Sequence, residues 1–209
     1  MKQEQRRYTS QGLIVAEAIK EFGEHGYGDA SINHICETGQ ISKGRMFHYF
    51  KDKDELFLTC VQYCYDHLQQ VQAFFQAAPA EGLAQSFHRY FQLRQQHFRS
   101  FPHEALMMRV AALSAPQHLK EQTSSMMEHF VEESAKVLYQ ILSGVQPPLP
   151  DTYFKEAVQI FNIASYYCHF RVGTTDWSPE KDMTEQLERN LAFFDRVVQL
   201  MLYGLLPRD

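Results

Sequence analysis

A serine and several basic side chains lie close together between residues 39 and 53. Four Lys or Arg residues and one Asp give this stretch a net charge of +3. The hydroxyl of Ser42 and the N–H groups of a helix that begins there suit a phosphate oxygen. The guanidinium of Arg45 matches the two acceptors on the major-groove edge of guanine. These residue types predict contact with a nucleic-acid backbone and with base edges.

Gly44 lies inside the same basic stretch. Glycine costs about 1 kcal/mol of helix stability relative to alanine, and packing alone does not explain that cost. A helix without a side chain at this position approaches a duplex more closely. The competing interpretation is that these basic residues form an ordinary solvated helix face. Two capped helices at turn spacing, the glycine and the interleaved aromatic residues favour the DNA interface.

Short helices position these residues. The pattern predicts a first helix over residues 10–25 that ends at Gly26, then helices over 32–38 and 43–50 capped by Ser31 and Ser42. Gly39 is expected to take a positive φ where the second helix ends. Asp52 to Glu55 reads as a variant capping box that opens a helix reaching residue 78. Two short helices joined by four residues have the dimensions of a helix-turn-helix.

The rest of the chain also reads as helical, so the predicted fold class is all-α. Val, Ile and Thr number 27 of 209 residues, too few for a strand-rich domain. Further helices are expected over 81–98, 102–113, 116–143, 151–172 and from 178 to 205, the last with Ser178 as cap and Pro179 at its first turn.

Three segments together resemble the N-terminal domain of the TetR family of bacterial transcriptional regulators. They are Phe22-Gly-Glu-His-Gly-Tyr27, Ala30-Ser-Ile-Asn-His-Ile-Cys36 and Gly39-Gln-Ile-Ser-Lys-Gly-Arg-Met-Phe-His-Tyr-Phe-Lys-Asp-Lys-Asp-Glu-Leu56. The resemblance covers about residues 10–57. It implies a helix-turn-helix DNA-binding domain over 1–56, with a linker helix from 53, and a helical effector-binding and dimerisation domain over 57–209. It also implies a regulator, most often a repressor, that binds a pseudo-palindromic double-stranded operator as a homodimer.

The resemblance also implies roles for individual residues. Residues at the start of the third helix would contact bases and nearby phosphates, and residues on either side would contact the DNA backbone. The DNA-binding set is Ser31, Ser42, Lys43, Gly44, Arg45, Phe47, His48, Tyr49 and Lys53. Phe47 stands where the family usually has Tyr, which removes a hydroxyl that could bind phosphate. Cys36 replaces a usual small Ala and is interpreted as structural.

The last two predicted helices carry apolar residues on more than one side, which indicates burial on two sides. In a chain of this size one side is expected to meet a second copy in a two-fold four-helix bundle. A monomer that buries both helices internally is the alternative. The interface residues expected on this basis are Phe154, Phe161, Leu187, Leu191, Phe194, Val198 and Met201.

The middle helices are rich in Met and aromatic residues, which adapt to irregular apolar ligands. Such residues also fill ordinary cores. The expected effector is unidentified, small and largely apolar or aromatic, with His88, His97 and either Tyr166 or Tyr167 as candidate polar anchors. Its lining is expected from Phe87, Tyr90, Phe91, Met107, Met108, Met127, Phe130 and Tyr167.

Cys60, Cys64 and His67 fall on one side of the linker helix, a spacing that suits a soft metal or a thiol switch. Cys64 also belongs to an apolar stripe, which favours a core position. A metal or thiol sensor with weak or lost DNA binding therefore stays an alternative, as does a helical ligand-binding protein whose head has lost DNA function. No metal site or cofactor is otherwise expected.

Composition narrows the class of protein. The 209 residues carry a net charge of −5 and 44% hydrophobic residues, typical of a folded globular chain. No apolar run approaches the roughly 20 residues of a membrane span, and the four cysteines follow no disulfide spacing, so a cytoplasmic protein is expected. A glycine-rich phosphate loop, a G-x-S-x-G elbow and an H-E-x-x-H pair are all missing from the sequence, which argues against an enzyme.

Overall fold

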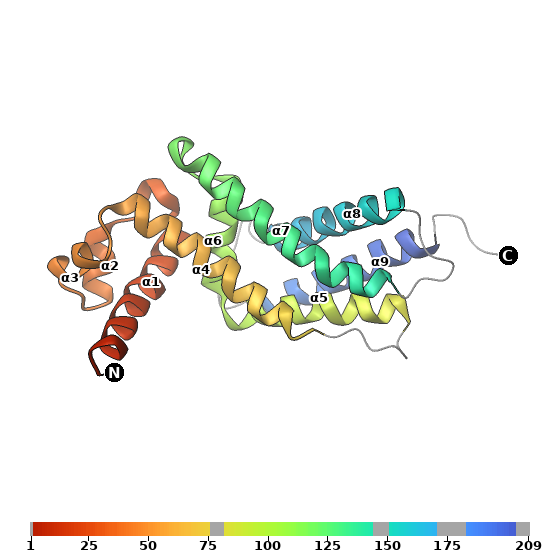
Figure 1. Cartoon of the computed structure of the whole chain (residues 1–209), viewed down its shortest axis with the longest axis horizontal. Helices are drawn as coiled ribbons and strands as arrows, with labels where there is room; N and C mark the ends of the chain where they lie inside the picture. The colour runs from red at the N-terminus through yellow and green to blue at the C-terminus, as the bar shows by residue number, and fades with distance from the viewer. Residues whose placement is uncertain (1, 76–81, 144–150, 171–182, 204–209) are drawn as a thin grey trace. The chain divides into compact units, whose positions relative to one another are not determined.

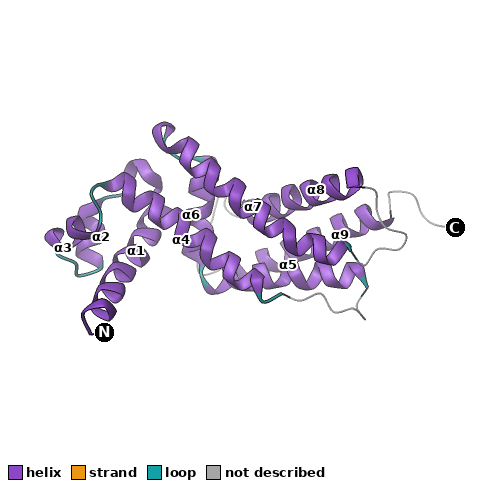
Figure 2. Cartoon of the chain, in the orientation of Figure 1, coloured by secondary structure: helices purple, strands orange, loops and turns teal. Residues whose placement is uncertain are grey.

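The computed structural model describes residues 2–75, 82–143, 151–170 and 183–203, with side chains for 11–75, 82–143, 155–164, 188–189 and 191–200 (Figure 1). Throughout these ranges the regular structure is helical and contains no strand (Figure 2). The all-α prediction is thus confirmed. Within the same ranges, no helix combines the length and hydropathy needed to cross a membrane.

The chain divides into two compact units. Unit 1 comprises residues 1–67 and 101–129, and unit 2 comprises residues 68–100 and 130–209. The elements of unit 1 are α1 (Lys2–Asp29), α2 (Ile32–Thr38), α3 (Lys43–Tyr49), most of α4 (Lys53–Ala73), α6 (Pro102–Leu113), the 3₁₀ helix η1 (Gln117–Leu119) and the start of α7 (Lys120–Leu142). The elements of unit 2 are the end of α4, α5 (Leu83–Ser100), the rest of α7, α8 (Asp151–Phe170) and α9 (Met183–Tyr203).

Helix α1 is longer than predicted, because it already begins at Lys2 rather than near residue 10. Its regular part ends at Gly26, as expected, where φ is 70° and ψ is 176°. Helix α6 packs closely on α1 at Gly23, where an added Cβ would lie 3.0 Å from the Cβ of Leu106. Glycine at this position lets the two backbones approach, and it ties α6 to the N-terminal helices.

Local side-chain caps define α2 and α3. Ser31 accepts a hydrogen bond from the N–H of His34, and Ser42 accepts one from the N–H of Arg45. Both predicted caps are confirmed. The capping box before α4 forms as well: Asp52 accepts from the Glu55 N–H at 2.9 Å. Glu55 reaches back to the Lys51 N–H at 2.7 Å, one residue earlier than in the usual arrangement.

The predicted positive φ at Gly39 is wrong. Gly39 has φ −77°, and Gln40 takes the left-handed conformation at φ 51°. Glycine is needed for space instead, because a Cβ at residue 39 would lie 2.6 Å from Cδ1 of Ile41 and 3.1 Å from the carbonyl oxygen of Ile35. The close approach packs the turn between α2 and α3 against α2 itself.

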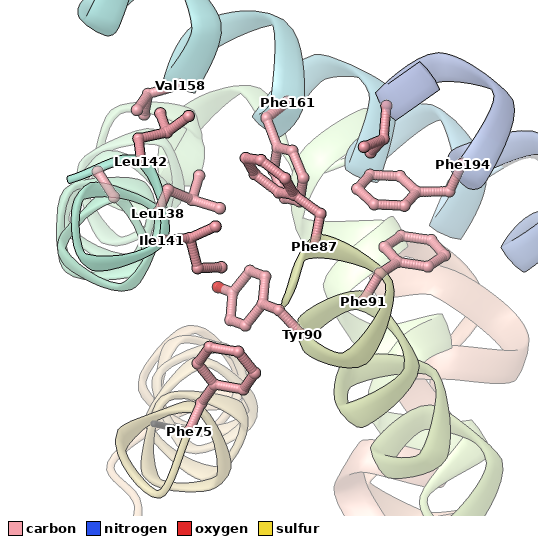
Figure 3. Close-up of a cluster of buried hydrophobic side chains, with 12 residues drawn as sticks. Phe75, Phe87, Tyr90, Phe91, Leu138, Ile141, Leu142, Val158, Phe161 and Phe194 are labelled. Carbon is pink, nitrogen blue, oxygen red and sulfur yellow. The ribbon is translucent and has the colours of Figure 1, made fainter. Parts of the chain in front are cut away.

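Aromatic residues dominate the core of unit 2 (Figure 3). The rings of Phe91 and Phe194 stack with centroids 3.7 Å apart, and Phe161 meets both Phe87 and Phe194. This core joins α5 to α8 and α9. Among the boundaries, α4 ends at Ala73 instead of residue 78 and α7 is preceded by η1, while the expected start of the last helix at Ser178 lies outside the described residues.

Candidate nucleic-acid interface

Helix α3 turns one face inward and leaves the other in solvent. Met46 and Phe50 are buried at 1% and 2% exposure, and they hold the helix on the core of unit 1. The opposite face exposes Lys43, Arg45 and His48. Phe47 is also exposed, at 53%, and so covers no core. A helix that presents basic and aromatic side chains around a capped N-terminus is suited to a phosphate backbone and to base edges.

Gly44 lies on this exposed face with nothing within 4 Å of the position that a Cβ would take. The protein's own packing therefore gives no reason for glycine here, unlike at Gly23 and Gly39. The absent side chain leaves the backbone of the first turn of α3 open to a neighbouring molecule. This is the geometry that close docking on a duplex requires.

A buried carboxylate that the sequence analysis missed orients α2. Glu21 of α1 is 6% exposed and accepts hydrogen bonds from the Ser31 N–H at 2.7 Å and from Nδ1 of His34 at 2.5 Å. Burial opposes ionisation, but the bonds from His34 and Ser31 outweigh it and lower the pKa of Glu21. The bond to Glu21 raises the pKa of His34. The pair fixes the start of α2, and with it Ser31.

The side chain of Lys53 already has partners within unit 1. Its Nζ donates to the carbonyl oxygen of Ala30 at 2.7 Å and lies 4.6 Å from the ring centroid of Tyr27. The Tyr27 hydroxyl donates to Asp54, which also lies 3.1 Å from Nε2 of His118. Burial and the Asp54 charge raise the pKa of Tyr27 to about 12, and the bond from Tyr27 lowers the pKa of Asp54. A phosphate contact by Lys53 would have to compete with these partners.

Comparison with known proteins agrees with this geometry. Residues 14–60 match the family model described as "Bacterial regulatory proteins, tetR family". The matched residues run from α1 through the helix-turn-helix into α4. Over these residues the chain is similar to the TetR family.

Individual transcriptional regulators are also similar to this chain. The chain is 23% identical over 203 residues to the HTH-type transcriptional regulator RutR of Escherichia coli (strain K12), covering 93% of this chain and 90% of RutR. It is 44% identical over 46 residues to the HTH-type transcriptional repressor AcnR of Corynebacterium diphtheriae, covering 22% of this chain. The local alignments span little of the relatives' own length, 24% for AcnR and 19% for another regulator.

The whole fold matches solved structures. The transcriptional regulator FadR of Bacillus subtilis, solved in complex with stearoyl-CoA, aligns with a TM-score of 0.66 at 12% identity, covering 93% of this chain and 98% of FadR. At this identity the likeness concerns the fold. The shared fold covers most of this chain and is not confined to residues 14–60.

The structure separates the predicted effector-lining residues into two groups. Phe87, Tyr90 and Phe91 lie together in the core of unit 2. Phe130 is buried in the same unit, while Met107, Met108 and Met127 belong to unit 1. The side chain of Tyr167 lies outside the described residues. Of the candidate polar anchors, His88 is held by Asp195 of α9 at 2.8 Å.

The described residues of the predicted dimer interface face inward. Phe161, Phe194 and Val198 are 1%, 0% and 3% exposed and pack in the core of their own chain, and Leu191 packs against that core. The side chains of Phe154, Leu187 and Met201 are not described. Among the described side chains of α8 and α9, the large apolar residues left in solvent are Ile160, Ile163 and Leu200. Periodicity marks two apolar stripes on these helices and does not say which side faces inward; the described members of the predicted stripe pack inside their own chain.

Cys60 and Cys64 are core residues of unit 1. Both are 0% exposed, and burial raises the pKa of each thiol. Cys60 donates weakly to the carbonyl oxygen of Val15, and Nδ1 of His67 lies 2.9 Å from the Glu104 carboxylate. Thiols that stay protonated and buried are poor nucleophiles and poor metal ligands. This geometry disfavours the sensing alternative for these two cysteines.

Sequence reasoning also missed Arg94 of α5 as a candidate ligand-binding residue. Its spacing places it among the apolar residues on one side of that helix. It is 3% exposed, and the rings of Tyr90 and Phe130 lie 6.0 and 5.7 Å from its Cζ. In a desolvated site, cation–π contacts stabilise a buried charge by about 2 kcal/mol. Removing an ion from water costs several kcal/mol. The two rings therefore leave much of the cost of burying this charge without compensation.

Proposed function

We propose that this protein is a ligand-responsive, DNA-binding transcriptional repressor. The observation that carries the proposal is the exposed face of α3, where a capped N-terminus, Arg45 and an unobstructed Gly44 stand together on a helix anchored by Met46 and Phe50. The name of AcnR, a repressor related through the same region, supports the direction of regulation.

The proposed division of labour follows the domain boundary expected from the sequence. Residues 1–56 read the operator, and residues 57–209 bind the effector and a second copy of the chain. The contacts to DNA come from Ser31, Ser42, Lys43, Gly44, Arg45, Phe47, His48 and Tyr49, with Lys53 contributing from the start of α4. The homodimer interface uses α8 and α9, and we assign it to the exposed stripe of Ile160, Ile163 and Leu200.

Release from DNA follows from the spacing of the two recognition helices. Half-sites one helical turn apart require two α3 helices about 34–36 Å apart. An effector bound in residues 57–209 releases the dimer from DNA if it binds more tightly to a conformation in which the two α3 helices have a different spacing. The size of the effect is limited by the difference between the effector's affinities for the two conformations. The expected effector has a largely apolar or aromatic body, and FadR, with stearoyl-CoA in its structure, offers a parallel within the shared fold.

Selection of bound sequences from random duplex DNA tests the proposal directly. The purified chain should enrich an inverted repeat whose half-site centres lie about 10 base pairs, or a multiple of that, apart. Recovery of no enriched sequence would favour the alternative of a helical ligand-binding protein that has lost DNA function. An enriched motif without two-fold symmetry would contradict the dimeric part of the proposal.

Arg45→Ala tests the assignment of base contacts. Losing a bidentate contact costs about 1–3 kcal/mol of discrimination per half-site, so the selected motif should lose preference at one position in each half. Ser42 and the helix cap remain, so the variant should fold normally. If the variant selected the same motif with the same base preferences as the unchanged protein, Arg45 would contact the DNA backbone or solvent and not a base. His129→Ala, on the exposed part of α7, is the control and should leave the motif intact.

A further inference from the structure

The interior of unit 2 holds a group of buried hydrogen-bond donors, here called the Arg94 cluster. It consists of Gln72 at the end of α4, Tyr90 and Arg94 on α5, and Ser134 on α7. Their exposed fractions are 2%, 0%, 3% and 1%, respectively. Polar side chains this deeply buried ordinarily have hydrogen-bond partners. Which partners they have decides what the cluster is for.

One well-formed hydrogen bond inside the Arg94 cluster joins α7 to the end of α4. The Ser134 hydroxyl donates to Oε1 of Gln72 at 2.9 Å, which leaves Nε2 of Gln72 as a donor. Among the residues that the structure describes, Nε2 of Gln72 and Nε of Arg94 have no hydrogen-bond partner. Burial raises the pKa of Tyr90, while the Arg94 charge and the side chains of Ser134 and Arg94, which donate to the Tyr90 hydroxyl, oppose that rise. The cluster therefore offers more donors than acceptors.

Arg94 also lacks a counter-charge. In the described part of the chain no carboxylate forms an ion pair with its guanidinium, whose contacts are with the rings of Tyr90 and Phe130 and with the Tyr90 hydroxyl. Arginine is almost never fully buried without a paired anion. A buried guanidinium surrounded by unused donors is complementary to an anion that comes from outside the chain.

Apolar side chains form the surroundings of this cluster. Tyr90 lies next to Phe75, with ring centroids 5.3 Å apart, and near Phe161. Figure 3 shows the Tyr90 oxygen pointing toward Ile141 of α7, away from Phe91 and Phe194. A ligand whose anionic group meets Arg94 would place the rest of its body among aliphatic and aromatic side chains. Such surroundings favour an apolar body.

We propose that Arg94, with Tyr90 and Gln72, binds the carboxylate of an apolar monocarboxylic acid, and that this acid belongs to the class of the effector. The planar guanidinium presents two parallel N–H groups to the two carboxylate oxygens. One cation balances one carboxylate. A phosphate monoester carries close to two charges at neutral pH, and the Arg94 cluster holds a single cation. The proposal rests on the proposed function and names the chemistry of its ligand.

The ligand-free protein gives the first test, through Arg94→Met. Methionine keeps the length and apolar stem of the side chain and removes the unpaired charge. The thermal midpoint of the variant should equal or exceed that of the unchanged protein, because replacing a buried, uncompensated ion by an apolar group is neutral or stabilising. A midpoint lower by more than about 5 °C would show that Arg94 has a native partner, and would overturn the proposal. Arg99→Met, on the exposed end of α5, controls for the loss of one charge.

The second test compares acids with their neutral amides. Octanoate and 3-phenylpropanoate should raise the thermal midpoint of the full-length protein, whereas octanamide and 3-phenylpropanamide at the same concentrations should not. The rise should vanish in Arg94→Met, persist in Arg99→Met and require about tenfold more acid in Tyr90→Phe, which loses one donor to a charged group. No rise with either acid, equal rises with acid and amide, or a rise confined to phenyl phosphate would each overturn the proposal.

A DNA-release measurement separates this inference from the proposed function. Fluorescence anisotropy of a selected operator should fall when the acid is added to the unchanged protein. Arg94→Met should bind the same operator with the same affinity and resist release. If neither protein binds DNA while the acids still raise the midpoint, the function fails and the carboxylate site stands. If both bind DNA and both are released by the acids, the site fails and the function stands.

Discussion

Three glycines show how residue-scale geometry distinguishes structure from function. A Cβ at Gly23 would press on α6, and one at Gly39 would press on Ile41. These two glycines are explained by the packing of unit 1. Gly44 meets nothing within 4 Å, yet it lowers the intrinsic stability of a seven-residue helix. The packing of the described residues leaves the stability lost at Gly44 unexplained, and our proposal is that α3 docks closely on a duplex there.

Gly44→Ala should separate stability from binding. The added methyl group meets open space and improves helix propensity, so the free energy of unfolding should rise by about 0.5–1 kcal/mol. Affinity for a selected operator should fall, because the methyl group stands where α3 approaches the duplex. Chemical denaturation and an operator titration measure the two effects.

Gly12→Ala is the matched control for this prediction. Gly12 is also exposed, helical and free of neighbours within 4 Å, so the substitution should raise stability similarly and leave operator affinity unchanged. If Gly44→Ala bound operator as tightly as Gly12→Ala does, close docking at the first turn of α3 would be wrong.

At the scale of elements, an ion pair between the exposed His34 and the buried Glu21 orients the helix-turn-helix. Glu21 on α1 holds both the Ser31 N–H and His34 of α2. Ser31 is thereby tied to α1 as well as to its own helix. Because α3 follows α2 after a short turn packed by Gly39, the same contacts set the direction in which α3 leaves the core.

This pair predicts how stability depends on pH. The pKa of folded His34 is raised above its ordinary value of 6.5, so its contribution is complete below about pH 6.5 and disappears as the pH rises through the folded pKa. Glu21 has a lowered pKa, so its contribution persists above about pH 4.5 and is lost as the pH falls through the folded value. The window in which both contribute lies between these limits.

His34→Ala should therefore destabilise the protein more at pH 5.5 than at pH 8.5. Thermal midpoints of the unchanged protein and the variant at the two pH values measure the difference. His129→Ala removes an exposed histidine on α7. It should change the thermal midpoint equally at the two pH values. A loss of stability in His34→Ala that is the same at both pH values would show that the protonated form makes no special contribution.

At the scale of the whole molecule, the proposed dimer depends on the apolar stripe that α8 and α9 leave in solvent. Ile163 is 68% exposed there, and Ile160 and Leu200 are about half exposed. Large apolar groups gathered on neighbouring helices favour burial against another surface. A two-fold axis would place the stripe of one copy against the same stripe of the other.

Ile163→Glu should convert the dimer into a 24.4 kDa monomer, because it places like charges near one another at the axis. Sedimentation at micromolar concentration measures the change, and operator affinity should fall with it. Leu113→Glu is the control, since Leu113 is equally exposed, at 69%, on α6 of unit 1. A monomeric unchanged protein, or a dimer that survives Ile163→Glu, would contradict the assignment.

Local chemistry in the sequence determined the helix-turn-helix. Ser31 and Ser42 cap helices whose bounds were predicted within a residue, because a cap and the N–H that it binds lie three residues apart. The all-α class and the exposed basic face of α3 followed from the same short-range patterns. The positive φ was assigned to Gly39 and is found at Gln40, because composition alone does not reveal how closely Ile41 approaches.

Only the tertiary structure decided which polar and apolar residues meet across elements. Periodicity marked two apolar stripes on α8 and α9, and the packing of Phe161 and Phe194 on α5 settled which one faces inward. Arg94 reads as one more residue of an amphipathic helix until the fold brings the rings of Tyr90 and Phe130 against it. The sequence contains caps and periodicity, which act over a few residues. Burial and charge pairing arise between segments far apart in the chain, and the folded core alone brings them together.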